Sequence, residues 1–217
     1  MNFETARLNM IEQQIRTWEV LNPQVLDLLT EIHREDFMPD KYKELAFADI
    51  CIPLAHGQVT MTPRVEARIL QSVSVLPGDK VLEIGTGCAY LTALLGLSAK
   101  EVISIDIYPE FTREAGIKLG KYNLNNIKLE TGDAINGWEK ESPYDVIVVT
   151  GSLPELSQAI KKQLNIGGRL FVIIGDSPVM EATLITRVAD NAWQEETLFE
   201  IDFPPLVGAH KQVKFEL

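Results

Sequence analysis

A Gly-x-Gly turn follows a short apolar segment, residues 81–84, near the middle of the chain, and its sequence is Gly85-Thr86-Gly87. Glycine has no Cβ and tolerates positive φ, so such a turn lets a ligand approach the backbone closely. The helix expected to start near Ala89 directs its free N–H groups at the same place. Asp106 ends the next apolar segment, nineteen positions after the second glycine. This spacing is typical of an acid that hydrogen-bonds ribose hydroxyls. The combination predicts a nucleoside pocket.

Two residues near the turn distinguish between nucleoside cofactors. A dinucleotide site carries a third glycine, and Tyr90 occupies that position here, which counts against a pyrophosphate cradle and an NAD-linked oxidoreductase. Glu83 would repel phosphates but would receive, directly or through water, the cationic amino-acid part of S-adenosylmethionine. Asp133 follows the third expected strand, within Gly132-Asp133-Ala134, where its carboxylate would lie near an adenine amino group; an Asx turn is the alternative.

The elements that must position these residues alternate along the chain. Apolar strands are expected at 81–84, 102–106, 127–130, 146–149 and 170–174, and helices at 90–97, 109–122 and 154–164, the last ended by Gly167-Gly168. This order predicts a doubly wound, Rossmann-like α/β fold with a mostly parallel sheet and helices on both faces. Residues 183–188 and 197–203 predict two more strands, as an antiparallel addition at one edge.

The N-terminal part is predicted to be helical, because apolar residues recur there at helical spacing. Helices are expected over 2–16, from Asn22-Pro23 to about 32, over 42–47 and from Pro63 to about 73, with loops at 34–39 and 56–63.

Composition narrows the function further. The 217 residues carry a net charge of −11, which argues against a nucleic-acid partner. No apolar run reaches the roughly 20 residues that span a bilayer, and the first residues lack a signal-peptide pattern, so a cytoplasmic location is expected. The two cysteines and three histidines lack ligand spacing, which predicts no metal. Cys88 either has its thiol pKa lowered by the helix N-terminus or, as we favour, simply fits a tight turn.

The order Glu-x-Gly-x-Gly, then Asp106, then Gly132-Asp133, resembles that of class I S-adenosylmethionine-dependent methyltransferases. More narrowly, the chain resembles the protein-L-isoaspartate O-methyltransferase family from about Met10 to Leu206. The matching stretches are Met10–Ile15, Arg34–Pro39, Ala48-Asp49, Gly57-Gln58 with Pro63, Val81–Tyr90, Gly132-Asp133, Tyr144–Val148 and Gly167-Gly168.

The resemblance implies an enzyme that methylates the carboxylate of isoaspartyl residues in damaged proteins or peptides, which starts their repair. It implies a single domain, 1–217, with residues 1–78 as an N-terminal helical and acceptor-loop region and 79–217 as the S-adenosylmethionine-binding core; the oligomeric state stays open. The expected cofactor residues are Glu83, Gly85, Thr86, Gly87, Tyr90, Asp106, Ile107, Gly132, Asp133, Ala134 and Thr150.

One loop departs from the family pattern, which reads Gly-Gln-Thr-Ile-Ser-Gln-Pro and has its serine assigned to the active site. Met61 stands at the serine position, and a thioether donates no hydrogen bond to a carboxylate. Thr60 or Thr62 would supply a hydroxyl only if the loop shifted by one residue. Losing one placed donor costs about 2.7–4 kcal/mol in comparable sites. Three hypotheses stay open: isoaspartyl repair, methylation of a different acceptor such as a small molecule with little isoaspartyl activity, or a non-catalytic cofactor-binding module. The segment Thr150-Gly151-Ser152 also departs from the family's Thr-Ala-Ala.

Overall fold

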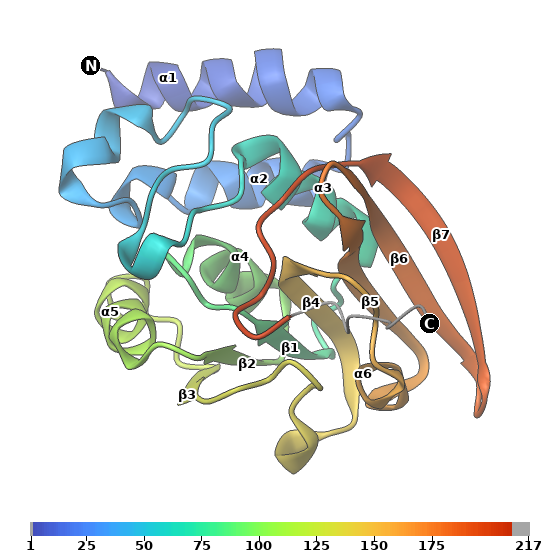
Figure 1. Cartoon of the computed structure of the whole chain (residues 1–217). Helices are drawn as coiled ribbons and strands as arrows, with labels where there is room; N and C mark the ends of the chain where they lie inside the picture. Colours follow the sequence, from blue (N-terminus) through green and yellow to red (C-terminus); the bar gives the residue numbers. More distant parts are fainter. Residues whose placement is uncertain (1, 210–217) are drawn as a thin grey trace, which may run out of the picture.

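A computed structural model describes residues 2–209 of the chain (Figure 1). Its α-helices are α1 (Phe3–Met10), α2 (Pro23–Glu31), α3 (Pro63–Val73), α4 (Tyr90–Ser98), α5 (Pro109–Gly120) and α6 (Gln158–Lys162). Its strands are β1 (Lys80–Ile84), β2 (Glu101–Asp106), β3 (Ile127–Thr131), β4 (Tyr144–Leu153), β5 (Leu164–Asp176), β6 (Val179–Ala189) and β7 (Ala192–Glu200).

One sheet joins all seven strands in the order β3-β2-β1-β4-β5-β6-β7. Strands β1 to β5 pair in parallel, and β6 and β7 add to the β5 edge as antiparallel neighbours. Their apolar runs suit burial on both faces, as parallel sheets require. The predicted Rossmann-like fold with an antiparallel edge addition is confirmed.

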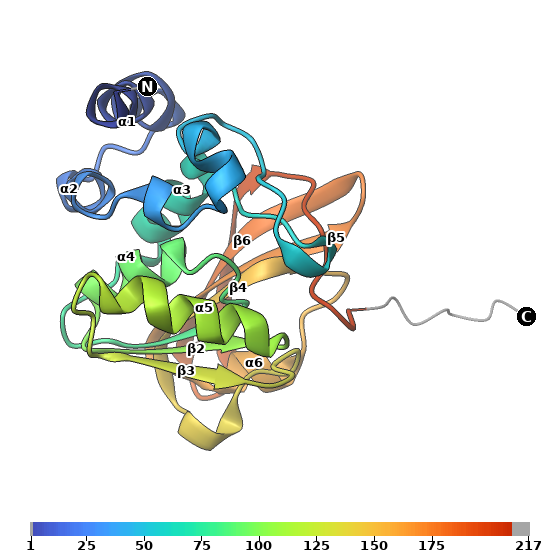
Figure 2. The same cartoon turned by 90° about the vertical axis from the view of Figure 1, so that its left-hand side faces the viewer.

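The two faces of the sheet support separate cores. Val81 of β1 belongs to the core beneath the N-terminal helices, α4 and α5, whereas Leu82 belongs to the opposite core, which includes Ile160 of α6. Figure 2 shows α4 and α5 on one side of β2 and β3, and α6 on the other. Successive strand residues point to opposite faces, so β1 contributes to both cores.

The structure differs from the sequence prediction between β4 and β5 and at the start of β5. The helix expected over 154–164 is shorter, because Ser157 caps it by accepting a hydrogen bond from the Ala159 N–H at 3.2 Å. Gly167-Gly168 does not end a helix; it lies inside β5, at a register shift against β4. Gly167 has φ +83, a conformation that glycine adopts without strain. The last strand ends at Glu200, not at 203.

The N-terminal region also differs in detail. Helix α1 ends at Met10 and continues as a π-helix, Ile11–Ile15, and a 3₁₀ turn, Arg16–Trp18. The expected loop over 34–39 begins with a 3₁₀ turn, Arg34–Asp36, and the helix expected over 42–47 is a 3₁₀ helix, Asp40–Leu45.

Candidate functional site

A cavity opens beyond the carboxyl ends of β1, β2 and β4, where open parallel sheets bind ligands. It encloses about 720 Å³ of space up to the solvent. We call it the strand-end cavity. Eight of the residues expected to hold a cofactor line it: Gly85, Gly87, Asp106, Ile107, Gly132, Asp133, Ala134 and Thr150.

Gly85 opens the turn and cannot carry a side chain. Its φ is +100, and a Cβ there would lie 2.1 Å from Thr150 Oγ1. That hydroxyl donates to the carbonyl oxygens of Ile84 and Gly85, at 2.9 and 2.7 Å. The end of β4 therefore fixes the turn after β1, and this explains why a glycine stands at that position.

Asp106 lies at the end of β2 and holds the glycine turn. Its Oδ2 accepts a hydrogen bond from the Gly87 N–H at 2.9 Å, and its Oδ1 accepts one from the Tyr108 N–H at 2.9 Å. Burial raises the pKa of this carboxyl, against the lowering effect of its N–H donors. The remaining acceptor capacity of a carboxylate suits ribose hydroxyls.

Asp133 is exposed on the cavity wall. Its Oδ1 accepts a hydrogen bond from the Ile135 N–H at 3.0 Å, so the Asx turn considered as its alternative is present. The other carboxylate oxygen is free of that turn, and contact with an adenine stays a prediction.

The structure does not bring Glu83, Thr86 and Tyr90 to the strand-end cavity among the residues it describes. Glu83 is buried, and its Oε2 accepts hydrogen bonds from Thr92 and Ser104 at 2.5 and 2.6 Å. Thr86 shares a hydrogen bond with Ser104 at 2.6 Å. Tyr90 is a core residue, its ring 5.7 Å from that of Phe37. These three residues are buried and stabilise the glycine turn through contacts with the core, away from the strand-end cavity.

Burial raises the pKa of Glu83 from 4.5 to about 8. Between these values the unfolded chain loses the proton while the folded chain keeps it, so stability falls as the pH rises, by up to about 1.4 kcal/mol per pH unit. We expect the unfolding midpoint of the ligand-free protein to drop from pH 5 to pH 8, and Glu83→Gln to flatten this slope. Chemical denaturation at several pH values measures it. Equal slopes for both proteins would contradict the assignment.

A smaller cavity, with about 350 Å³ of space up to the solvent, lies on the other side of the glycine turn. Thr60 and Met61 line it together with Glu66 of α3, Gly85 and Thr150. We call it the loop cavity. Thr62 borders neither cavity within the described residues, and its Oγ1 is buried without a partner. The structure thus places two of the three acceptor-loop candidates against the turn.

Arg34 holds this loop in place, a role that the sequence reading missed. Only 1% of the residue is exposed. Its Nε donates to Glu66 Oε2 at 2.9 Å, its Nη1 to the Ala46 carbonyl at 2.8 Å, and its Nη2 to the Met61 carbonyl at 2.7 Å and to Thr60 Oγ1 at 3.3 Å. The sequence signal was that Arg34 begins Arg34–Pro39, one of the stretches that match the family.

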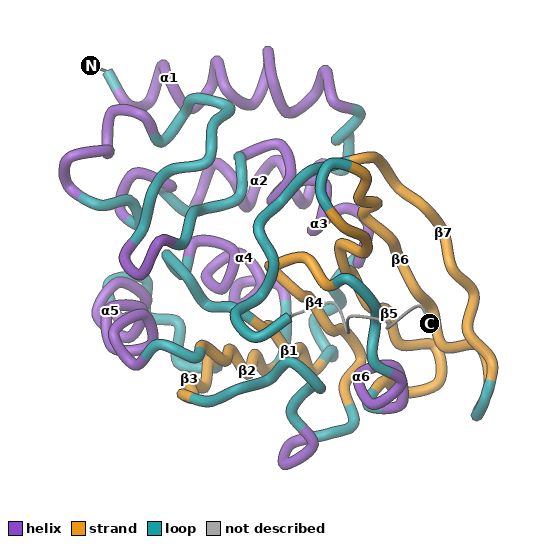
Figure 3. Tube along the Cα trace, viewed as in Figure 1, coloured by secondary structure: helices purple, strands orange, loops and turns teal. Residues whose placement is uncertain are grey.

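Residues 203–207, after β7, also line the strand-end cavity. Figure 3 shows this segment as a loop that runs from β7 back to β4, where Pro205 bridges Ser152. Ser152 Oγ donates to the Phe203 carbonyl at 2.8 Å, and the Leu206 N–H donates to the Ser152 carbonyl at 3.0 Å. A Cβ on Gly151 would lie 2.8 Å from the Leu206 side chain. Gly151 and Ser152, which stand where the family has Ala-Ala, therefore fit the packing and hydrogen bonding of the segment after β7.

Cys88 is buried, and burial raises the pKa of its thiol to about 11, opposite to the effect of a helix N-terminus. Within residues 2–209, no three His, Cys, Asp or Glu side chains are grouped to hold a metal ion. No helix in the same range is long and apolar enough to cross a membrane.

The strand order, the glycine turn and the acid at the end of β2 define a Rossmann-like methyltransferase fold. The model of the protein-L-isoaspartate(D-aspartate) O-methyltransferase family matches residues 5–211. The chain belongs to this family.

Curated relatives agree with this membership, and a solved structure shares the fold. Protein-L-isoaspartate O-methyltransferase 1 of Rhodopseudomonas palustris (strain HaA2) is 34% identical over 95% of this chain and 85% of its own length. The Protochlamydia amoebophila protein-L-isoaspartate O-methyltransferase is 36% identical, over 92% and 95%. A Plasmodium falciparum structure described as this methyltransferase, in complex with S-adenosyl-L-homocysteine, shares the fold, with TM-score 0.78, 18% identity and coverage of 95% and 98%.

Proposed function

We propose that the chain is an S-adenosylmethionine-dependent protein carboxyl O-methyltransferase that methylates isoaspartyl residues in damaged proteins. One observation carries the proposal: the acceptor loop, residues 57–63, packs against a glycine turn whose other side opens into the strand-end cavity. The relatives' names supply the reaction class.

Asp106 would bind the ribose, Ile107 and Asp133 the adenine, and Gly85 and Gly87 would let the cofactor approach the backbone. S-adenosylmethionine supplies an activated sulfonium methyl. The acceptor carboxylate is ionised at neutral pH, so the chain needs no strong general base. Its residues would contribute alignment of the reacting atoms and exclusion of water.

Thr60 is the residue that we assign to the acceptor carboxylate in place of the family serine. Its Oγ1 accepts hydrogen bonds from the Ile52 N–H at 3.0 Å and from Arg34, which uses both lone pairs and leaves the O–H free to donate. The side chain lines the loop cavity. Met61 lines it too, but supplies no donor.

We expect Thr60→Val to lower kcat for an isoaspartyl peptide about 100-fold, because one donor is lost. Thr60→Ser should keep most activity, and cofactor affinity should stay unchanged in both variants. The matched control is Thr62→Val, which removes a hydroxyl two residues away. Steady-state kinetics and calorimetry give the comparison; a larger loss in Thr62→Val would transfer the role to Thr62.

Labelled S-adenosylmethionine and an isoaspartyl peptide test the function itself. The proposal expects a base-labile methyl ester on the isoaspartyl peptide and none above background on the matched aspartyl peptide. Absence of ester on both would overturn it. Met61 and the carboxylate of Glu66 in the loop cavity favour one second candidate, a small-molecule acceptor. Turnover of such an acceptor without isoaspartyl turnover would support that candidate.

Location, partners and domain organisation are also part of the proposal. We place the chain in the cytoplasm, with protein or peptide partners and no nucleic acid, in line with its net charge of −11. We also keep a single domain, residues 1–217, since one core cluster joins the N-terminal helices to the sheet. Tight cofactor binding without turnover on any acceptor would instead indicate a non-catalytic binding module.

A further inference from the structure

His56 has a backbone conformation that costs energy. It lies between Leu54 and Gln58 of the acceptor-loop region, with φ 55 and ψ 26 in the left-handed region. A non-glycine residue adopts this conformation only where its surroundings impose it, and such residues cluster at functional sites. Backbone bonds fix the turn, from the Leu54 N–H to the Gln58 carbonyl at 2.8 Å and from the Gln58 N–H to the Ala55 carbonyl at 3.0 Å.

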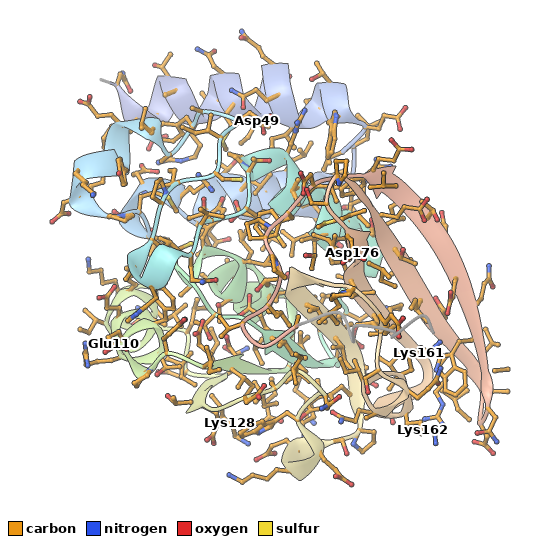
Figure 4. All side chains as sticks on the ribbon, in the orientation of Figure 1. Asp49, Glu110, Lys128, Lys161, Lys162 and Asp176 are labelled. Carbon is orange, nitrogen blue, oxygen red and sulfur yellow. The ribbon has the colours of Figure 1, made fainter. Side chains whose placement is uncertain are left out.

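The imidazole of His56 stacks on Tyr108, from the turn between β2 and α5. The two ring centroids are 4.1 Å apart and the planes are 4° from parallel. The edge of Phe111 completes the contact at 5.8 Å. His56 Nε2 lies 3.5 Å from Glu110 Oε2, and Figure 4 shows Glu110 at the start of α5.

This contact joins two walls of the strand-end cavity. Leu54, Gln58 and Val59 line one wall, and Tyr108 and Phe111 line the other. His56 is absent from the lining among the described residues, so it bridges the walls from outside without occupying ligand space. A ligand cannot widen the gap between the loop and α5 without breaking the stack.

We propose that His56, Tyr108 and Glu110 form a clasp that closes the strand-end cavity and sets the rate at which a nucleoside ligand leaves. The inference rests on the proposed cofactor site. The stacked rings hold the acceptor loop against the start of α5, and Glu110 Oε2 lies beside the imidazole Nε2.

The test is the dissociation rate of S-adenosylhomocysteine, measured by stopped-flow displacement. His56→Ala should release the ligand about threefold to tenfold faster than the unaltered protein, since the stack is lost. His56→Gly also removes the ring but suits the left-handed backbone, so it keeps the test valid if His56→Ala folds poorly.

Two further variants complete the test. His56→Phe should keep slow release, because its ring can still stack on Tyr108. His33→Ala is the matched control and should leave release unchanged. Failure of the unaltered protein to bind S-adenosylhomocysteine would overturn the proposed function. Binding with equal release rates in the unaltered protein, His56→Ala and His56→Gly would overturn the clasp alone.

Discussion

Replacing Arg34 by Met should destabilise the protein by about 3–5 kcal/mol, a large share of the 5–15 kcal/mol that holds a typical domain folded. The guanidinium is buried, and its removal leaves the Glu66 carboxylate without its partner. Burial already raises the pKa of Glu66, and loss of Arg34 would raise it further. The carbonyls of Ala46 and Met61 would lose a donor as well.

Urea unfolding measures the loss, with Arg16→Met as the matched control. Arg16 is 46% exposed and lies 3.5 Å from Glu12, so its removal should cost under about 1 kcal/mol. Glu66→Gln in the Arg34→Met background should recover part of the stability, because no buried charge then remains. Equal stability of Arg34→Met and Arg16→Met would show that the buried pair does not organise the loop.

Replacing Asp106 by Ala should weaken cofactor binding by about 1–3 kcal/mol, through loss of charge-assisted hydrogen bonds. Two effects contribute. The ribose loses its carboxylate, and the N–H groups of Gly87 and Tyr108 lose their acceptor. The glycine turn is therefore less well held in the variant even before the ligand arrives.

Calorimetry with S-adenosylhomocysteine measures this effect. Asp106→Asn keeps the shape of the side chain and one acceptor oxygen, so it separates the effect of the charge from that of the turn geometry. Its affinity for S-adenosylhomocysteine should lie between those of the unaltered protein and Asp106→Ala. Asp190→Ala, at an 87% exposed aspartate in the turn between β6 and β7, should bind like the unaltered protein. Unchanged affinity in Asp106→Ala would mean that the ribose lies elsewhere.

The sheet and its ligand-binding end were predictable, because their signals are local. Apolar runs indicate β1 to β5. Asp106 is the last residue of β2 and Asp133 lies two residues after β3, so parallel pairing of these strands brings the two residues together. The helix expected over 154–164 is present but shorter, because Ser157 offers a cap that competes with an earlier start. Gly167 was read as a helix end because a bulge inside a strand needs the same backbone freedom.

The support behind the site was not predictable, because it depends on contacts between distant segments. Arg34 reads as a surface charge until the fold places Glu66 and two carbonyls around it. Tyr90 was assigned to the cofactor from its position in the glycine motif, yet its side chain turns into the core against Phe37. Sequence spacing gives the place of a residue, but not the side of the turn that its side chain takes.

The most direct test of the account is a crystal structure with S-adenosylhomocysteine. We predict that the ribose hydroxyls lie within hydrogen-bond distance of Asp106, about 2.5–3.2 Å, and that the sulfur is directed past the glycine turn toward Thr60 and the loop cavity. A ligand bound outside the strand-end cavity, or a sulfur directed away from the acceptor loop, would contradict it.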